Sequence, residues 1–250
     1  MMGALLYRGM LVGLVAGLIA FGFAHLYGEP YVDLAIAFEE SHEAAEASHD
    51  AAEEAQDSHS HGGKEEIVSR HTQAGFGLLT ALVVYGAGIG GLFSCVCGYA
   101  FGRIGKLGVM ATSLLLAATA FVSVVLVPQL KYPSNPPAVG SPETIVSRTE
   151  DYFALILISF LAMVLVYIAV HRLKNRYGGL NAAIFAMIGY AIFMGIVYFI
   201  MPVINEVPAD FSADVLWHFR LATFGIQAIL WLILGLGFGY LAQKRLKSLP

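Results

Sequence analysis

The chain has 250 residues, of which 58% are hydrophobic and 13% are charged, and its mean hydropathy is +0.71. This apolar content exceeds what one soluble core of this length requires, so the composition indicates an integral membrane protein. The 14 basic and 18 acidic residues give a net charge of −4, which excludes the broad basic surface that nucleic-acid binding needs.

Six apolar segments are long enough to cross a membrane as helices. A helix needs about 20 apolar residues to cross about 30 Å of hydrocarbon, where its backbone finds no other hydrogen-bond partners. The segments are Leu5–Tyr27, Gln73–Phe101, Leu107–Leu130, Tyr152–Val170, Leu180–Ile204 and Leu216–Leu241. We therefore predict an all-α bundle of six transmembrane helices, forming a single membrane domain over residues 1–250. A cleaved signal peptide is the alternative interpretation of the first segment, although its apolar run is longer than usual.

Glycines recur at every fourth position in three of these segments. They are Gly9, Gly13 and Gly17 in the first segment, Gly86 and Gly90 in the second, and Gly235 and Gly239 in the sixth. Small residues at this spacing let two helix backbones approach closely in lipid. We expect these faces to be helix contacts, and a glycine-lined pathway is the alternative.

Residues 28–72 form a polar insertion between the first two spans. The insertion holds 12 of the 18 acidic residues and five of the eight histidines. Alanine and glutamate favour a helix from Phe38 to Ala55, and one face of that helix would carry alternating imidazole and carboxylate groups. The residues of this face are His42, Glu46, His49 and Glu53.

Imidazole nitrogen and carboxylate oxygen together suit divalent first-row metal ions. His59 and His61 add a His-x-His pair, and the glycines that follow permit both rings to turn toward one ion. We therefore predict that the insertion captures a transition metal outside the membrane. A solvated low-complexity loop and a pH-sensing segment are the alternatives.

Further candidate metal ligands lie near the ends of the spans on the same side. They are His25, Glu29, His71 and His218. His25 and His218 are placed to meet across the mouth of the bundle, and anchoring at the membrane interface is the alternative.

Lysines and arginines are distributed unevenly between the two sides of the predicted bundle. Nine of the 14 fall on the side of both termini, whereas all 18 acidic residues fall in the three connections on the other side. Because basic residues stay on the cytoplasmic side, we predict cytoplasmic termini and an outer face that attracts cations.

The connection after the third span is rich in proline. It reads Lys131-Tyr-Pro-Ser-Asn-Pro-Pro137, and proline fixes φ and removes N–H donors, so we predict a stiff, non-helical loop. A lid over the outer mouth and a rigid connector both fit this pattern. The candidate loop or gating residues of this connection are Lys131, Tyr132, Pro133, Asn135, Pro136 and Pro137.

Several strings in this chain together resemble the CbtA family of predicted cobalt transporter subunits. They are Arg8–Gly17, Gly28–Pro30, Ala35–Glu40, Arg70–Gly75, Lys131–Pro137, Trp217–Arg220 and Trp231–Gly239. The resemblance implies that Co²⁺ is the substrate, and that a small single-span subunit, CbtB, with a histidine-rich tail is the partner. Glu39, Glu40 and Arg148 match motif positions of the family, so we expect Glu39 and Glu40 to be further metal ligands and Arg148 to be a further loop or gating residue.

The resemblance also implies a multi-pass protein of a bacterial or archaeal cytoplasmic (inner) membrane. Uptake of cobalt is the function that we expect, with no enzymatic activity and no permanently bound cofactor. The alternatives are transport of nickel or another divalent metal, a non-transporting metal sensor or scaffold, and a haem-binding membrane electron carrier that uses facing histidines.

Overall fold

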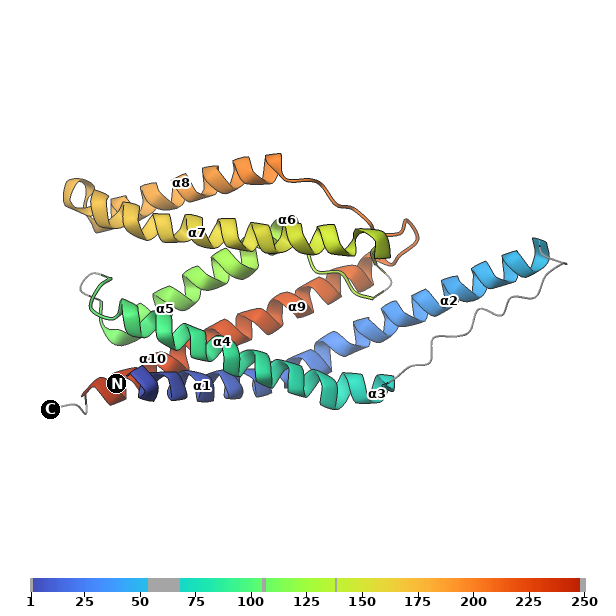
Figure 1. Ribbon diagram of the computed structural model, residues 1–250, viewed down its shortest axis with the longest axis horizontal. Helices are drawn as coiled ribbons and strands as arrows, with labels where there is room; N and C mark the ends of the chain where they lie inside the picture. Colours follow the sequence, from blue (N-terminus) through green and yellow to red (C-terminus); the bar gives the residue numbers. More distant parts are fainter. Residues whose placement is uncertain (1, 54–67, 105–106, 138, 248–250) are drawn as a thin grey trace.

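The computed structural model describes residues 2–53, 68–104, 107–137 and 139–247, and the side chains of residues 46–53 are not described. Within this part of the chain, all regular secondary structure is helical. Six helical runs are long and apolar enough to span a membrane: Met2–Ala45, Arg70–Ala100, Val109–Lys131, Pro142–Tyr177, Gly179–Ile200 and Ala213–Lys247. The six predicted spans are confirmed, and the chain is a multi-pass membrane protein (Figure 1).

Four of the runs contain a π-helical turn. The first run is α1 (Met2–Phe23), the turn Ala24–Gly28 and α2 (Glu29–Glu53). The second is α3 (Arg70–Thr72), the turn Gln73–Gly77 and α4 (Leu78–Ala100), and the third is α5 (Val109–Ala120), the turn Phe121–Leu126 and α6 (Val127–Lys131). A 3₁₀ turn (Pro142–Thr144) precedes α7 (Ile145–Tyr177), and α8 (Gly179–Ile200) follows. The last run is α9 (Ala213–Ile233), the turn Leu234–Phe238 and α10 (Gly239–Lys247).

The first helical run extends well beyond the predicted span. We expected the span to end near Tyr27 and a separate helix to begin at Phe38, but α2 starts at Glu29 and projects past the rest of the bundle (Figure 1). Pro30 cannot donate a backbone hydrogen bond, and its ring would crowd the preceding turn of a regular α-helix. The π turn directly before Pro30 widens the helix and lets it continue. The predicted helix is therefore confirmed from Phe38 to Glu53, and it starts nine residues earlier than expected, so that residues 29–53 form one helical arm.

The glycine faces predicted from the sequence are helix contacts, as expected. A Cβ atom built on Gly13 would lie 2.0 Å from the carbonyl oxygen of Gly86, and one on Gly9 would lie 2.3 Å from that of Gly90. α1 and α4 therefore touch backbone to backbone, which only glycine permits at this distance. Gly17 packs in the same way on the backbone of Leu82, whereas Gly235 and Gly239 of the last run pack on the side chains of Ala117 and Met110.

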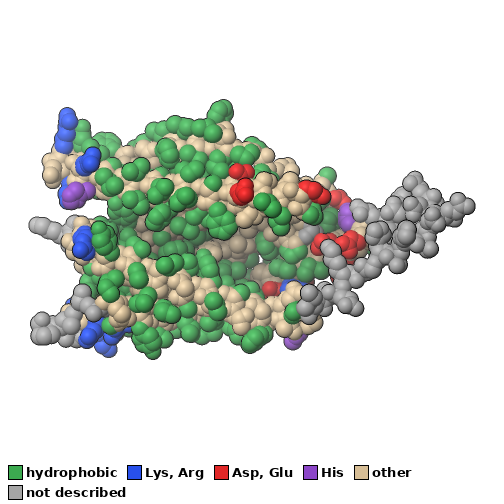
Figure 2. All heavy atoms as spheres, viewed as in Figure 1, with side chains coloured by type: hydrophobic (Ala, Val, Ile, Leu, Met, Phe, Trp, Pro, Cys, Tyr) green, Lys and Arg blue, Asp and Glu red, His purple; other side chains and the backbone are tan. Residues whose placement is uncertain are grey.

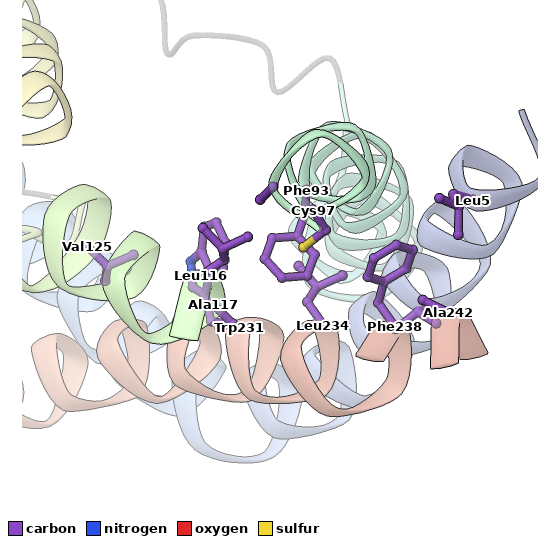
Figure 3. Close-up of a cluster of buried hydrophobic side chains, with 12 residues drawn as sticks. Leu5, Phe93, Cys97, Leu116, Ala117, Val125, Trp231, Leu234, Phe238 and Ala242 are labelled. Atoms are coloured by element: carbon purple, nitrogen blue, oxygen red, sulfur yellow. The ribbon is translucent and has the colours of Figure 1, made fainter. Parts of the chain in front are cut away.

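The largest apolar cluster fills the interior of the bundle in the half that carries the chain termini. It contains residues of α1, α4, α5 and the α9–α10 run, and Figure 3 shows its side chains. The ring of Phe93 meets those of Trp231 and Phe238 edge-on, with centroid distances of 6.1 and 5.8 Å. This cluster closes the interior toward the termini.

The two ends of the bundle differ in charge. Lysine and arginine side chains gather at the end that carries the termini, whereas aspartate and glutamate side chains gather at the opposite end (Figure 2). We call these the basic end and the acidic end. The arm α2 projects from the acidic end (Figure 1).

Candidate functional site

A cavity of about 600 Å³ lies at the acidic end, between α6, α7, α9 and the two connections 132–141 and 201–212. We call it the mouth cavity. Its lining consists of Gln129, Tyr132, Pro133, Ser134, Asn135, Val139, Ile145, Arg148, Thr149, Tyr152, Phe153, Ile204, Asn205, Glu206, Val207, Arg220, Thr223 and Gln227. Four of the candidate loop residues, Tyr132, Pro133, Asn135 and Arg148, belong to this lining.

Lys131 and Tyr132 attach the proline-rich connection to the end of α8. The Lys131 ammonium donates to the carbonyl oxygens of Tyr198 at 2.9 Å and Met201 at 3.1 Å. These carbonyls lie at the C-terminal end of α8, where the helix dipole favours a positive charge. The Tyr132 hydroxyl donates to the carbonyl of Pro202 at 2.9 Å. The connection is thereby held at its first two residues.

Residues 132–137 and 139–141, the part of the connection that the structure describes, have no regular secondary structure, as predicted. Arg220 of α9 holds its middle, because the guanidinium donates to the side-chain oxygen of Asn135 at 2.8 Å and to the Ser134 carbonyl at 3.2 Å. Pro136 is buried and Pro137 is exposed in a turn. These contacts place the connection along one wall of the mouth cavity.

Arg148 and Glu206 join the two connections that border the cavity. A guanidinium nitrogen of Arg148 lies 3.2 Å from the Glu206 carboxylate. That carboxylate also accepts hydrogen bonds from the Thr144 hydroxyl at 2.5 Å and the Ser141 backbone N–H at 2.9 Å. The hydrogen bonds from Thr144 and Ser141, followed by the charge of Arg148, lower the pKa of Glu206. Glu206 is therefore ionised at neutral pH and holds the 141–148 segment.

A glycine permits Arg148 to lie close to the backbone of this connection. Gly140 has a φ of +132°, and a Cβ atom there would lie 2.5 Å from a guanidinium nitrogen of Arg148. Both its backbone conformation and the space available thus favour glycine at this position.

The base of the arm packs against the wall of the cavity. Ala35 of α2 forms a buried cluster with Val139 and Phe211, and Val139 also lines the cavity. Phe38 packs edge-on against Phe211, with 5.0 Å between the ring centroids. One turn further along, a ring nitrogen of His42 lies 2.6 Å from the Asp210 carboxylate. The arm is thus fixed to the 201–212 connection through an apolar contact and a polar one.

Glu29, a predicted metal ligand, pairs with an arginine. Arg70 contacts the carboxylate of Glu29 and lies 2.9 Å from that of Asp33. A metal ion bound at these carboxylates would have to displace the guanidinium. Glu39, Glu40 and His71 are exposed at the surface.

His25 and His218 contact different aromatic side chains. The ring of His25 stacks on Phe21 with 5.6 Å between centroids, and that of His218 stacks on Tyr31 at 4.9 Å. A ring nitrogen of His218 also lies 2.9 Å from the Asp214 carbonyl oxygen. These contacts suit anchoring of the two rings by neighbouring aromatic side chains.

The remaining predicted ligands are described only in part. Glu46, His49 and Glu53 lie in α2, in the stretch whose side chains are not described, and His59 and His61 lie outside the described residues. Among the residues that the structure describes, no group of three or more His, Cys, Asp or Glu side chains is placed to hold a metal ion. Metal capture by the arm stays a prediction.

Among the lining residues that the sequence did not single out are three with polar or charged side chains that matter for the cavity: Glu206, Arg220 and Gln227. Gln227 lies within the sixth apolar segment and Arg220 near its beginning. A polar side chain in such a segment tends to face the bundle interior, so this position could have identified both. Glu206 gives no comparable indication, because its partners come from connections distant in sequence.

The mouth cavity, the apolar cluster and the charged ends are features of a chain that matches one known family over nearly its full length. Residues 2–243 match the family described as "Probable cobalt transporter subunit (CbtA)". No curated protein and no solved structure matches the chain significantly. The match confirms the resemblance found in the sequence. The chain belongs to the CbtA family of probable cobalt transporter subunits.

Proposed function

We propose that this chain carries Co²⁺ inward across the cytoplasmic membrane, together with a single-span subunit of the CbtB type. The observation that carries the proposal is the separation of charge between the two ends of the bundle (Figure 2). Basic residues remain in the cytoplasm, so the basic end and both termini face inward. The acidic end, the arm and the mouth cavity then face outward.

An acidic outer face supports uptake because it raises the local concentration of cations. The arm adds imidazole groups to these carboxylates, and this mixed donor set suits Co²⁺ better than Mg²⁺ or Ca²⁺. Nickel is the closest competing substrate because it prefers similar ligands. The membrane potential contributes about 4.6 kcal/mol per 100 mV to the entry of a dication, which favours the inward direction.

The interior of the bundle supports an outward-facing arrangement. The mouth cavity lies at the acidic end, and the apolar cluster around Phe93, Trp231 and Phe238 closes the opposite half. An ion that enters from the acidic end therefore meets a closed interior, and its release requires the helices around this cluster to separate.

Uptake of radiolabelled cobalt tests the proposed function. Cells that express this chain with its partner subunit should accumulate cobalt from a trace external concentration faster than cells that carry the empty vector. Nickel in excess reports selectivity in the same assay. Uptake equal to that of the vector control would refute transport by this chain.

Replacement of histidines in the arm tests metal capture separately. The triple variant His49→Ala, His59→Ala and His61→Ala keeps the contact between His42 and Asp210. It should raise the half-saturating cobalt concentration and leave the maximal rate unchanged, because a collector changes only the local concentration. His171→Ala, at the basic end, is the matched control. A fall in the maximal rate of the triple variant would contradict the collector role.

Thiol accessibility tests the orientation. In a background with Cys95 and Cys97 replaced by serine, Ser41→Cys on the arm should react with a membrane-impermeant maleimide in intact cells. Lys174→Cys at the basic end should react only after the cells are permeabilised. The reverse pattern would place the arm in the cytoplasm and overturn the proposal.

A further inference from the structure

The lining of the mouth cavity carries more positive than negative charge. Its ionised groups are Arg148, Glu206 and Arg220, and the first two form an ion pair. Arg220 donates only to neutral oxygens, and within the described part of the chain no carboxylate lies within 4.0 Å of its guanidinium. The cavity therefore holds one unbalanced positive charge, although it lies at the acidic end.

This charge makes the cavity a poor site for a free metal dication. Two guanidinium groups repel Co²⁺, and the single carboxylate is already neutralised by Arg148. The same groups attract an anion. Arginine in particular presents a planar fork of N–H donors that matches a carboxylate, and Arg220 uses only some of its five donors within the protein.

Two further polar atoms of the lining lack a partner. The side-chain oxygen of Gln227 and the Nε–H of Arg148 are buried and form no hydrogen bond among the described residues. One is an acceptor and the other a donor, so a ligand that carries both carboxylate oxygens and a hydroxyl group can satisfy them. The volume of about 600 Å³ is in the range typical of small-molecule sites and far exceeds that of an ion.

We infer that the mouth cavity binds a small hydroxy-polycarboxylate anion, either free or as its complex with Co²⁺. Arg220 binds a carboxylate of this ligand, and Gln227 accepts a hydrogen bond from its hydroxyl group. Binding of the Co²⁺ complex rests on the proposed function and deepens it, because the transported species is then a carboxylate complex of the metal instead of the hydrated ion.

Binding of radiolabelled citrate to the purified full-length protein in detergent tests this inference. The wild type should bind citrate saturably, and Arg220→Gln should weaken binding about tenfold or more, because it removes a charged hydrogen-bond donor. Arg103→Gln is the matched control, since Arg103 lies at the basic end, over the ring of Tyr99. No saturable binding to the wild type, or equal loss in both variants, would overturn the inference.

Arg220 also holds the proline-rich connection, so a second variant separates ligand binding from loop structure. Gln227→Glu leaves that connection untouched and adds a negative charge to the lining, which should again weaken citrate binding about tenfold or more. Its thermal unfolding midpoint should match that of the wild type. Unchanged citrate affinity in this variant would refute the site, whatever Arg220→Gln does.

Competition and metal addition identify the ligand class. Inorganic phosphate should displace citrate poorly, and displacement as effective as by unlabelled citrate would overturn the assignment to carboxylates. Tighter binding of citrate with equimolar Co²⁺ supports the complex, and unchanged binding supports the free anion. Wild-type protein that transports cobalt but binds no citrate refutes this inference alone, whereas citrate binding without cobalt uptake refutes the proposed function alone.

Discussion

Substitution of Gly13 by alanine should separate α1 from α4 and destabilise the protein. The added methyl carbon would lie 2.0 Å from the carbonyl oxygen of Gly86 and 3.1 Å from the Cα of Gly90. Both are backbone atoms, so no side-chain rotation relieves the clash. The helices must move apart by about 1 Å to restore an ordinary contact, which loosens the packing along the whole interface.

Overpacking of this kind costs about 1 to 3 kcal/mol. For a chain of this size, 1 kcal/mol corresponds to roughly 2 to 4 °C in the unfolding midpoint, so Gly13→Ala should lower the midpoint by about 2 to 12 °C. Thermal unfolding of the purified protein in detergent measures the shift. Gly88→Ala is the matched control, because a Cβ atom on Gly88 meets no atom within 4 Å. Equal midpoints for the two variants would refute the close contact between α1 and α4.

Three other substitutions test the polar contacts by the same unfolding assay. Lys131→Met removes two hydrogen bonds at the C-terminal end of α8 and should cost about 1 to 3 kcal/mol, whereas Lys174→Met at the basic end should be neutral. Ser159→Ala removes the hydroxyl that donates to the Ser123 carbonyl at 2.6 Å in the π turn of the third span, and leaving this carbonyl unpaired should cost about 1 to 3 kcal/mol. The lowered pKa of Glu206 stabilises the folded protein above the carboxyl's unfolded pKa, and this contribution is lost as the pH falls through the lowered value. In Glu206→Gln, the free energy of unfolding should therefore fall less than in the wild type as the pH drops below about 4. The same pH dependence in both proteins would contradict the stabilising contacts of Glu206.

The number and position of the spans could be predicted because each depends on a local property of the sequence. An apolar run of sufficient length must be helical in lipid, and glycines four residues apart identify a face. The face formed by Gly9, Gly13 and Gly17 was therefore visible in the sequence, although its partner on α4 follows only from the fold.

The mouth cavity could be predicted only in part, since it depends on contacts between distant segments. The proline-rich connection marked one wall, but nothing local indicates that Lys131 reaches the end of α8 or that Glu206 meets Arg148. The start of the arm was also placed too late, because the alanine- and glutamate-rich composition marks a helix only from Phe38, whereas α2 begins at Glu29 directly after the π turn.

The continuity of α1 and α2 has a mechanical consequence. The 25 residues of α2 extend for about 37 Å from the end of the π turn. A tilt of about 5° at the base would displace the far end by about 3 Å if the helix stays straight. Small rotations of α1 within the bilayer are thereby amplified at the far end of α2. The tilt of α1 and the position of the histidines and carboxylates on the arm therefore change together.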